Sequence, residues 1–373
     1  MNEDRAARYH RSRRWASVAA TAAGGAWLLS LLATGASSAL AAQVRTAAGT
    51  LQPPLARPLS IVIFVAAIAL GWELLSLPFV FYRNFLLERK YGLSSEPLST
   101  WARDHAKGLA LGLVLTLAAG LVVYGMMAVS RSFWWVLTAA LFGVAAVLLS
   151  RIAPIVLMPL FYRFRPLDRE TLRERLLTLS RRAGVPVLGA FEWGLGEKTT
   201  RANAALVGLG NTRRILVSDT LLKDYTEDEI EVILAHEMAH HIHHDIWTSL
   251  AVETAVVAVA LLAANSAAAR FAVPAGATGA ADLAALPIII VSAGLVSLLL
   301  TPIGNAWSRY NERRADRFAL TLTGRPGAFI SAMRRLGQQN LAEERPSAAV
   351  LWFFHTHPTI DQRIETARAF DAA

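Results

Sequence analysis

Six long apolar runs constrain the fold of this chain more than any other feature of its sequence. A transmembrane helix needs about 20 predominantly apolar residues to cross the hydrocarbon core of a bilayer, and each run is long enough. Of the 373 residues, 54% are hydrophobic and only 17% are charged. That balance excludes an ordinary soluble enzyme and predicts a mainly α, polytopic membrane protein. The runs are approximately Trp15 to Ala42, Ser60 to Phe81, Gly108 to Val129, Phe133 to Leu160, Ile246 to Ala264 and Leu286 to Gly304.

Two of these runs allow a second interpretation. The fourth contains Arg151 and Pro154, so it is expected to be kinked or partly buried in protein. The first follows a basic segment and includes Ser37-Ser38-Ala39, which resembles the cleavage site of a signal peptide. Its apolar part is longer than that of a signal peptide and five further runs follow, which favours a retained span over a cleaved leader.

Positive charge predicts the orientation of the spans. The basic N-terminus and the segments 83–107, 163–245 and 308–373 alternate with loops whose only basic residues are Arg45, Arg57, Arg131 and Arg270. Basic residues concentrate on the cytoplasmic side, so both termini and segment 163–245 are predicted there, at a bacterial inner membrane. Topology signals and contacts with anionic lipid explain the net charge of +9 without a nucleic-acid partner.

The spans divide the chain into four parts. Residues 1–162 form an N-terminal membrane region with about four helices, and residues 163–245 form a cytoplasmic catalytic insert. Residues 246–306 supply two further spans, and residues 307–373 form a C-terminal catalytic segment. The insert is predicted to be a small α+β unit, with a helix from Leu167 to Ala183 and strands at Pro186 to Trp193 and Arg214 to Ser218. A strand containing Asn203 to Val207 is predicted to bind an extended peptide along its edge.

Within the insert the chain reads His236-Glu237-Met238-Ala239-His240, the His-Glu-x-x-His motif of zinc proteases. Thr226 begins a capping-box pattern upstream, so the motif is expected on a helix that starts near Thr226. One helical turn then separates the two histidines on one face, where both imidazoles reach one metal ion and Glu237 stands beside the reacting water. The competing interpretation places these histidines in an ordinary core or on a solvated surface helix.

A third metal ligand is expected at Glu312. A catalytic zinc ion usually takes three protein ligands, and the chain has no cysteine, so the third must be His, Glu or Asp. Asp316 lies four residues after Glu312 on the same predicted helix face, where it can orient a ligand histidine. The alternative is a solvated charged helix in which Arg309, Arg313, Arg314 and Arg317 pair with both acids.

Other polar groups have less specific interpretations. His241, His243 and His244 follow the motif, and a solvated or carboxylate-paired role is favoured over metal binding. Glu73 and Glu253 lie within apolar runs, where a carboxylate must face a cavity, water or a polar partner. Lining of a cavity and structural pairing are both open, with the cavity favoured for Glu253. His357 precedes Pro358 and is the candidate donor to the developing oxyanion, or a purely structural turn residue.

From about Tyr82 to Ala367 the chain resembles the type I CAAX prenyl protease family, integral-membrane zinc metalloproteases of the gluzincin kind, and in particular a bacterial member. Two blocks particular to that family are Glu88 to Ser94 and Pro154 to Leu167. Further matching groups are Asn203-Ala204, Asp219 to Leu222, the His-Glu-x-x-His motif, Asn311 to Asp316, and Thr356 to Pro358 with Arg363-Ile364.

The resemblance implies a role for each matching residue. His236, His240 and Glu312 would bind one Zn²⁺ per chain, Glu237 would be the catalytic base and acid, and Asp316 would orient a ligand histidine. His357 and Arg363 would close the site, and Asn203 and Ala204 would contact the substrate. The family also encloses a large chamber among its spans. Two departures concern that chamber and the substrate pocket: six spans are expected here against seven in the eukaryotic members, and Ala205 replaces an aromatic residue.

Three functions follow as expectations. The favoured one is a zinc metalloendopeptidase that cuts near the C-terminus of prenylated, CAAX-type peptides. The second is a membrane quality-control endopeptidase of the heat-shock type, and the third is a catalytically silent membrane scaffold. The presence of Glu237 argues against the third, because a silent relative has little need for the catalytic base.

Overall fold

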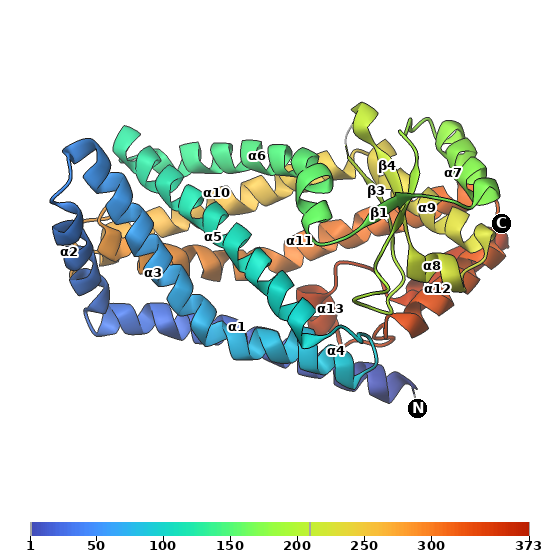
Figure 1. Ribbon diagram of the computed structural model, residues 1–373, viewed down its shortest axis with the longest axis horizontal. Helices are drawn as coiled ribbons and strands as arrows, with labels where there is room; N and C mark the ends of the chain where they lie inside the picture. The colour runs from blue at the N-terminus through green and yellow to red at the C-terminus, as the bar shows by residue number, and fades with distance from the viewer. Residues whose placement is uncertain (1, 209, 373) are drawn as a thin grey trace.

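The computed structural model describes residues 2–208 and 210–372. Long helices form an extended bundle, and a small sheet with its covering helices lies at one end of it (Figure 1). In the described residues six helices are long and apolar enough to cross a membrane, which confirms the predicted mainly α, six-span fold. They are α1 (Asn2–Ala33), α3 (Pro53–Phe81), α5 (Leu98–Val129), α6 (Trp134–Ile152), α10 (Asp245–Phe271) and α11 (Leu286–Thr323).

The first apolar run does not form one helix as predicted. Helix α1 ends at Ala33, and a separate helix α2 (Ala36–Ala48) folds back beside α3. Gly35 makes the turn with φ 73, a left-handed conformation that glycine adopts without a steric penalty. The hydroxyl of Ser37 then donates to the carbonyl of Ala284 at 2.8 Å, so α2 caps the end of the bundle. The apolar run from Trp15 to Ala42 therefore contains the end of one span, the turn at Gly35 and the start of α2.

Short irregular helices extend or join the spans. A π-helical turn η1 (Tyr82–Leu86) and helix α4 (Leu87–Lys90) continue α3. The fourth apolar run is interrupted as predicted, because α6 ends at Ile152 and a π-helical turn containing Pro154 follows. The remaining turns are η2 (Ala153–Leu157), η3 (Met158–Leu160) and η5 (Leu283–Ala285).

The insert contains a four-stranded sheet in the order β1-β2-β4-β3. The expected strands near residues 190 and 214 form a parallel pair, and β3 pairs antiparallel with β4 at one edge. Sequence reasoning missed the three-residue β1, which pairs antiparallel with β2. The strands are β1 (Phe164–Pro166), β2 (Ala190–Trp193), β3 (Ala204–Val207) and β4 (Arg214–Ser218).

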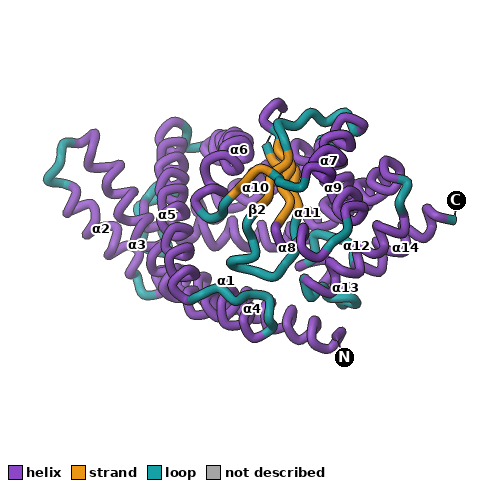
Figure 2. The backbone as a smooth tube through the Cα atoms, turned by 45° about the vertical axis from the view of Figure 1, so that its right-hand side comes forward, coloured by secondary structure: helices purple, strands orange, loops and turns teal. Residues whose placement is uncertain are grey.

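Both faces of the sheet are covered (Figure 2). Ile215 and Val217 of β4 face a core that includes α7, α9 and residues near the C-terminus, while Leu216 faces a smaller aromatic cluster around Trp193. Residues 167–238 and 319–367 therefore share one core, although the spans α10 and α11 lie between them in sequence. The helices of this unit, with a short turn η4 (Gly210–Thr212), are α7 (Glu170–Arg182), α8 (Asp219–Asp224), α9 (Glu227–Ile242), α12 (Pro326–Gln339), α13 (Ala348–Phe354) and α14 (Ile360–Asp371).

Candidate metal centre and active site

Helix α9 carries the two motif histidines, and its start is fixed by the capping box that the sequence predicts. The Thr226 hydroxyl accepts from the backbone N–H of Glu229, and the Glu229 carboxylate accepts from the backbone N–H of Thr226 at 2.8 Å. Nearly the whole helix is buried, so α9 forms the centre of the catalytic unit rather than a surface helix. The rings of His236 and His240 lie 5.0 Å apart, side by side on one face.

Glu312 of α11 completes a three-residue group with these histidines. His236 Nε2 lies 3.2 Å from Glu312 Oε2, and His240 Nε2 lies 3.5 Å from Glu312 Oε1. One potential ligand atom from each of the three residues lies within 4.8 Å of the others. The structure thus brings together, from two helices far apart in sequence, the three residues predicted to hold the metal.

The donor set fits a catalytic zinc ion. Two imidazole nitrogens and one carboxylate form a known three-ligand zinc site that leaves a position open for substrate or water. In the described part of the chain, Glu312 Oε2 is buried and accepts no hydrogen bond. A buried carboxylate oxygen without a donor is costly, and a bound cation would compensate it.

Asp316 and Arg363 lie behind His236. Asp316 Oδ1 is 2.9 Å from His236 Nδ1, and the Arg363 guanidinium holds the same carboxylate with contacts of 2.6 and 3.0 Å. This arrangement fixes the ring so that Nε2 points to Glu312. Burial and Arg363 oppose protonation of His236, but the neighbouring carboxylates of Asp316 and Glu312 raise its pKa to about 9. The surrounding negative charge that attracts a proton would equally attract a metal cation.

Asp245 lies behind His240 in the same way, and sequence reasoning missed it. Asp245 Oδ2 is 2.8 Å from His240 Nδ1, and Arg314 pairs with the other carboxylate oxygen. The chain reaches this position because α9 ends at Ile242 and His244 adopts φ 58, so α9 and α10 are two helices rather than one. The position of Asp245, five residues after the second histidine, was the feature of the sequence that could have indicated this contact.

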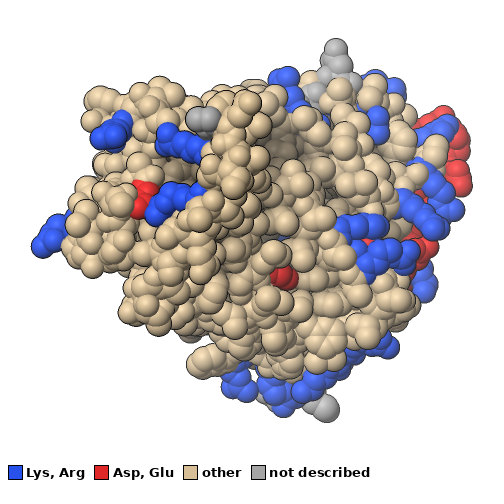
Figure 3. All heavy atoms as spheres, turned by 60° about the vertical axis from the view of Figure 1, so that its left-hand side comes forward, with Lys and Arg blue, Asp and Glu red and all other residues tan. Residues whose placement is uncertain are grey.

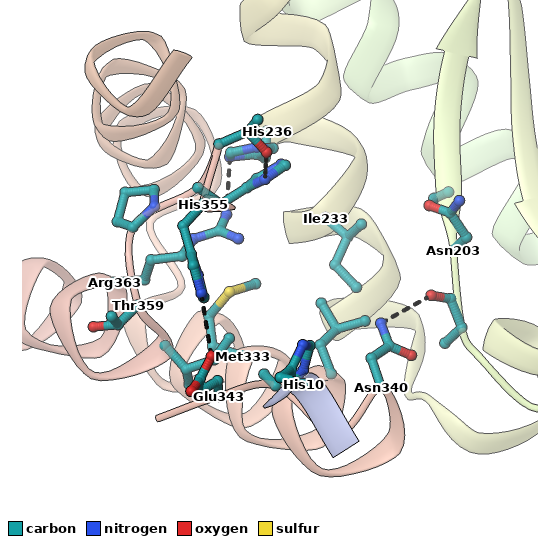
Figure 4. A pocket seen from close by; sticks show the side chains of 18 of the residues that line it. His10, Asn203, Ile233, His236, Met333, Asn340, Glu343, His355, Thr359 and Arg363 are labelled. Carbon is teal, nitrogen blue, oxygen red and sulfur yellow. Dashed lines mark hydrogen bonds and ion pairs between the residues drawn. The ribbon is translucent and has the colours of Figure 1, made fainter. Parts of the chain in front are cut away.

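A cavity of about 670 Å³ lies at this centre, with His236 and Asn203 on its walls (Figure 4). Glu237 also lines it. Close packing around Glu237 raises the pKa of its carboxyl group. The same cavity is lined by Asn203 and Ala204 of the sheet edge and by His357 and Arg363 from the C-terminal segment. All predicted site residues therefore line this cavity or lie directly behind its wall.

His357 stands where the cavity opens. Its Nε2 lies 3.3 Å from Glu312 Oε1, while 60% of its side chain is exposed. The neighbouring hydroxyl of Thr356 is 2.8 Å from His357 Nδ1 and steadies the ring. A histidine near the third ligand, facing open space, can donate to an oxyanion that forms beside the metal position.

The edge strand β3 offers main-chain groups to this cavity. The carbonyl of Asn203 accepts from the N–H of Ser218, so the main-chain groups of residue 203 face β4. Because these groups alternate along a strand, the N–H and C=O groups of Ala204 and Leu206 point toward the free edge. His241 Nε2 lies 2.9 Å from the carbonyl of Leu206, which ties the strand to α9. Ala204 is left as the edge residue nearest the motif. His241 consequently positions the strand, which is a role that sequence reasoning did not assign.

Helix α1 and the Glu88 to Ser94 block hold the approach to β3. Glu88 is 9% exposed and accepts from Arg201 at 2.9 Å and from the Tyr9 hydroxyl. Arg201 lies two residues before Asn203, so this buried cluster fixes where the edge strand begins. The block that carries part of the family resemblance thus packs against the start of the edge strand.

The remaining polar groups lie away from the centre. Glu73 pairs with His105 at 2.9 Å within the bundle, whereas Glu253 is exposed on α10. His243 packs edge-on against the ring of Phe318, and His244 forms the turn between helices. Among the described residues, none of these joins the metal-binding group.

Comparison with known proteins places this geometry in context. Residues 166–371 match the model of peptidase family M48, and residues 2–163 match the model described as CAAX prenyl protease N-terminal, five membrane helices. The crystal structure of S. mikatae Ste24p superimposes with a TM-score of 0.83 over 98% of this chain and 88% of that chain, at 20% identity. The overall fold is shared.

Sequence relatives include proteins from bacteria and fungi. The uncharacterized metalloprotease YhfN of Bacillus subtilis is 28% identical over 82% of this chain and 72% of the relative. The probable CAAX prenyl protease 1 of Schizosaccharomyces pombe is 29% identical over 81% of this chain. The match covers 64% of that fission yeast protein, so part of its length has no counterpart here.

Proposed function

The chain belongs to peptidase family M48 and is a zinc-dependent membrane metalloprotease of the CAAX prenyl protease type, and from this premise we propose that it cuts peptides near their C-termini, with a preference for lipidated substrates. The observation that carries the proposal is the shared cavity. Glu237, His236 of the metal group and Ala204 of the edge strand β3 all border one space of about 670 Å³.

We propose that His236, His240 and Glu312 hold one Zn²⁺ per chain. When bound there, zinc supplies Lewis-acid polarisation of the scissile carbonyl and makes water more acidic. Glu237 takes the proton from the attacking water and returns it to the departing amine. His357 donates to the developing oxyanion, and Ala204 pairs with the main chain of the peptide, which keeps the substrate extended.

An apolar surface beside the cavity supports the preference for lipid. Helix α13 packs along α11 and exposes Trp352, Phe353 and Phe354, and Phe354 also lines the cavity. The carbonyl of Trp352 accepts from Asn305 at 2.9 Å, so the helix is fastened to a membrane span. A lipid chain on the peptide could lie against these rings, where each buried methylene contributes about 0.8 kcal/mol.

We expect a farnesylated C-terminal peptide to be cleaved faster than its unlipidated twin, with the unlipidated peptide still cleaved measurably. The difference should lie mainly in KM, because the lipid binds away from the scissile bond. Steady-state rates for the two peptides with purified enzyme give the comparison. Equal rates would indicate a general peptidase, and cutting only at internal sites of unfolded membrane proteins would favour the quality-control function.

We also propose that the protein lies in a bacterial inner membrane with the metal centre facing the cytoplasm. Both ends of the described chain lie toward the catalytic end of the bundle, as an even number of spans requires (Figure 1). The arginine-rich segments are on that same end, in agreement with the positive-inside rule.

Cysteine labelling tests this orientation cleanly because the chain has no native cysteine. A cysteine replacing Asp168, just before α7, should react with a membrane-impermeant thiol reagent only after the cells are opened. A cysteine replacing Ser130, at the opposite end of α5, is the matched control and should react in intact spheroplasts. Labelling in the reverse pattern would contradict the proposed orientation.

A further inference from the structure

A second cavity lies at the end of the bundle opposite the metal centre. It has a volume of about 590 Å³ and is bordered by α2, α3, the start of α6 and the turn before α11. Arg45, Arg57 and Arg131 line it together with the apolar and aromatic side chains of Ile61, Met127, Tyr124 and Trp134. None of these residues takes part in the peptidase chemistry proposed above.

The charge of this end is concentrated at the cavity. The connecting segments 34–59, 130–133 and 265–285 contain four arginines, no lysine and a single carboxylate, Asp282. Three of the four arginines line the cavity, and the exception is Arg270. In Figure 3 a few basic side chains gather near an acidic one at this end, among side chains of other kinds on the face that is drawn. Basic residues are usually few on this side of a membrane protein, so their convergence calls for a reason.

Asp282 neutralises only one of the three arginines. It pairs with Arg45 at 2.8 Å and also accepts from the N–H and hydroxyl of Thr278 at 2.8 and 2.7 Å. Arg57 and Arg131 are exposed and have no ion pair within the described residues. Two uncompensated guanidinium groups therefore share one cavity with a neutralised third, an arrangement that an anion would stabilise.

The walls of the cavity indicate what kind of anion fits. The Trp134 indole N–H donates to Asn265 at 2.7 Å and the Tyr124 hydroxyl donates to the carbonyl of Asp282 at 3.3 Å, so both rings are fixed. Tyrosine and tryptophan concentrate at the level of lipid headgroups. Ile61 and Met127 continue the wall along α3 and α5, which are membrane spans. A molecule that carries a phosphate and acyl chains matches both the arginines of the cavity and its apolar wall.

We propose that this cavity binds the phosphate of an anionic phospholipid headgroup through Arg57 and Arg131, with the acyl chains lying along the adjoining spans. Guanidinium groups bind phosphate in a bidentate geometry that a lysine cannot reproduce. The lipid would hold together the segments that meet at this end and line the cavity. A free phosphate ion offers the same charge but no chains, so the two sources can be separated by experiment.

The test uses the full chain in a neutral detergent, titrated with phosphatidylglycerol or phosphatidylcholine and followed by native mass spectrometry. Phosphatidylglycerol should bind the wild type selectively, and R57Q/R131Q should lower its affinity by about fivefold for each arginine removed. The R270Q variant removes one positive charge from the same side outside the cavity, as each single substitution R57Q or R131Q does within it, and should bind like the wild type. Zinc content and peptide cleavage verify that each variant is folded.

Three outcomes would overturn the proposal. They are unchanged affinity in the double variant, equal binding of the two lipids, and inorganic phosphate that competes as well as phosphatidylglycerol at the same concentration. Salt gives a check that does not depend on any variant. High ionic strength should weaken binding of phosphatidylglycerol to the wild type, because exposed charges are screened, and an unchanged affinity would also overturn the proposal.

Discussion

Replacing Glu237 with glutamine should lower kcat by about 10²- to 10⁴-fold, the usual contribution of general acid–base catalysis, while one zinc ion per chain stays bound. Glutamine keeps the size of the side chain but cannot accept the proton of the attacking water. Glu237 also lies outside the three-residue metal group, so the metal should remain. Peptide cleavage and zinc analysis on the same purified sample measure both quantities.

The control for this substitution is Glu227→Gln in the first turn of the same helix. Glu227 pairs with Arg175 at 3.1 Å on the surface of the catalytic unit, away from the cavity. Its replacement should leave kcat within about twofold, since exposed ion pairs contribute little to stability. If Glu237→Gln retained full turnover, Glu237 could not be the base, and a different proton acceptor would have to be found.

Replacing Glu312 with glutamine should weaken zinc binding by more than about 100-fold, and activity should be lost with the metal. The ligand set would lose its only negative charge, and the buried amide would replace a carboxylate oxygen that now has no hydrogen-bond donor. Asp245→Asn should have a smaller effect, about 10- to 100-fold, because Asp245 orients His240 without joining the metal group. Competition with a chelator of known affinity measures both variants on one scale.

The order of the two effects is the informative result. If Asp245→Asn lost more zinc affinity than Glu312→Gln, the ligand role would have been given to the wrong carboxylate. The metal site would then lie closer to α10. Added zinc should restore activity to Asp245→Asn but only weakly to Glu312→Gln. Asn203→Ala, on the opposite wall of the cavity, should leave zinc affinity unchanged and is the control for general damage to the site.

The sequence predicted local structure well where one segment carries the whole signal. The capping box at Thr226 and the spacing of His236 and His240 depend only on a single helix, and the structure has both. The apolar runs likewise marked each span, because a bilayer demands about 20 apolar residues in succession. The ends of the runs were less certain: a turn at Gly35 is compatible with an uninterrupted apolar stretch, since α2 packs on other helices.

Contacts between distant segments were harder to predict. Arg363 meets Asp316 across the C-terminal segment, and only the family resemblance placed it near the site. The spacing of Asp245 from His240 was the only local signal for its role, and that role depends on the left-handed turn at His244, which the sequence did not predict. Strand β1 has three residues and ends in Pro166, so neither its length nor its composition predicts a strand.

Helix α11 connects the chemistry to the bilayer mechanically. Its 38 residues extend roughly 57 Å, nearly twice the thickness of about 30 Å of a hydrocarbon core, so the part that carries Glu312 projects from the membrane. His236 and His240 lie instead on α9, which the left-handed turn at His244 separates from the following span α10. A metal ion held by His236, His240 and Glu312 would therefore link α9 to the helix that continues into the membrane. An ion bound there would join the extramembrane unit to the span as well as activate water, and its release would weaken that link.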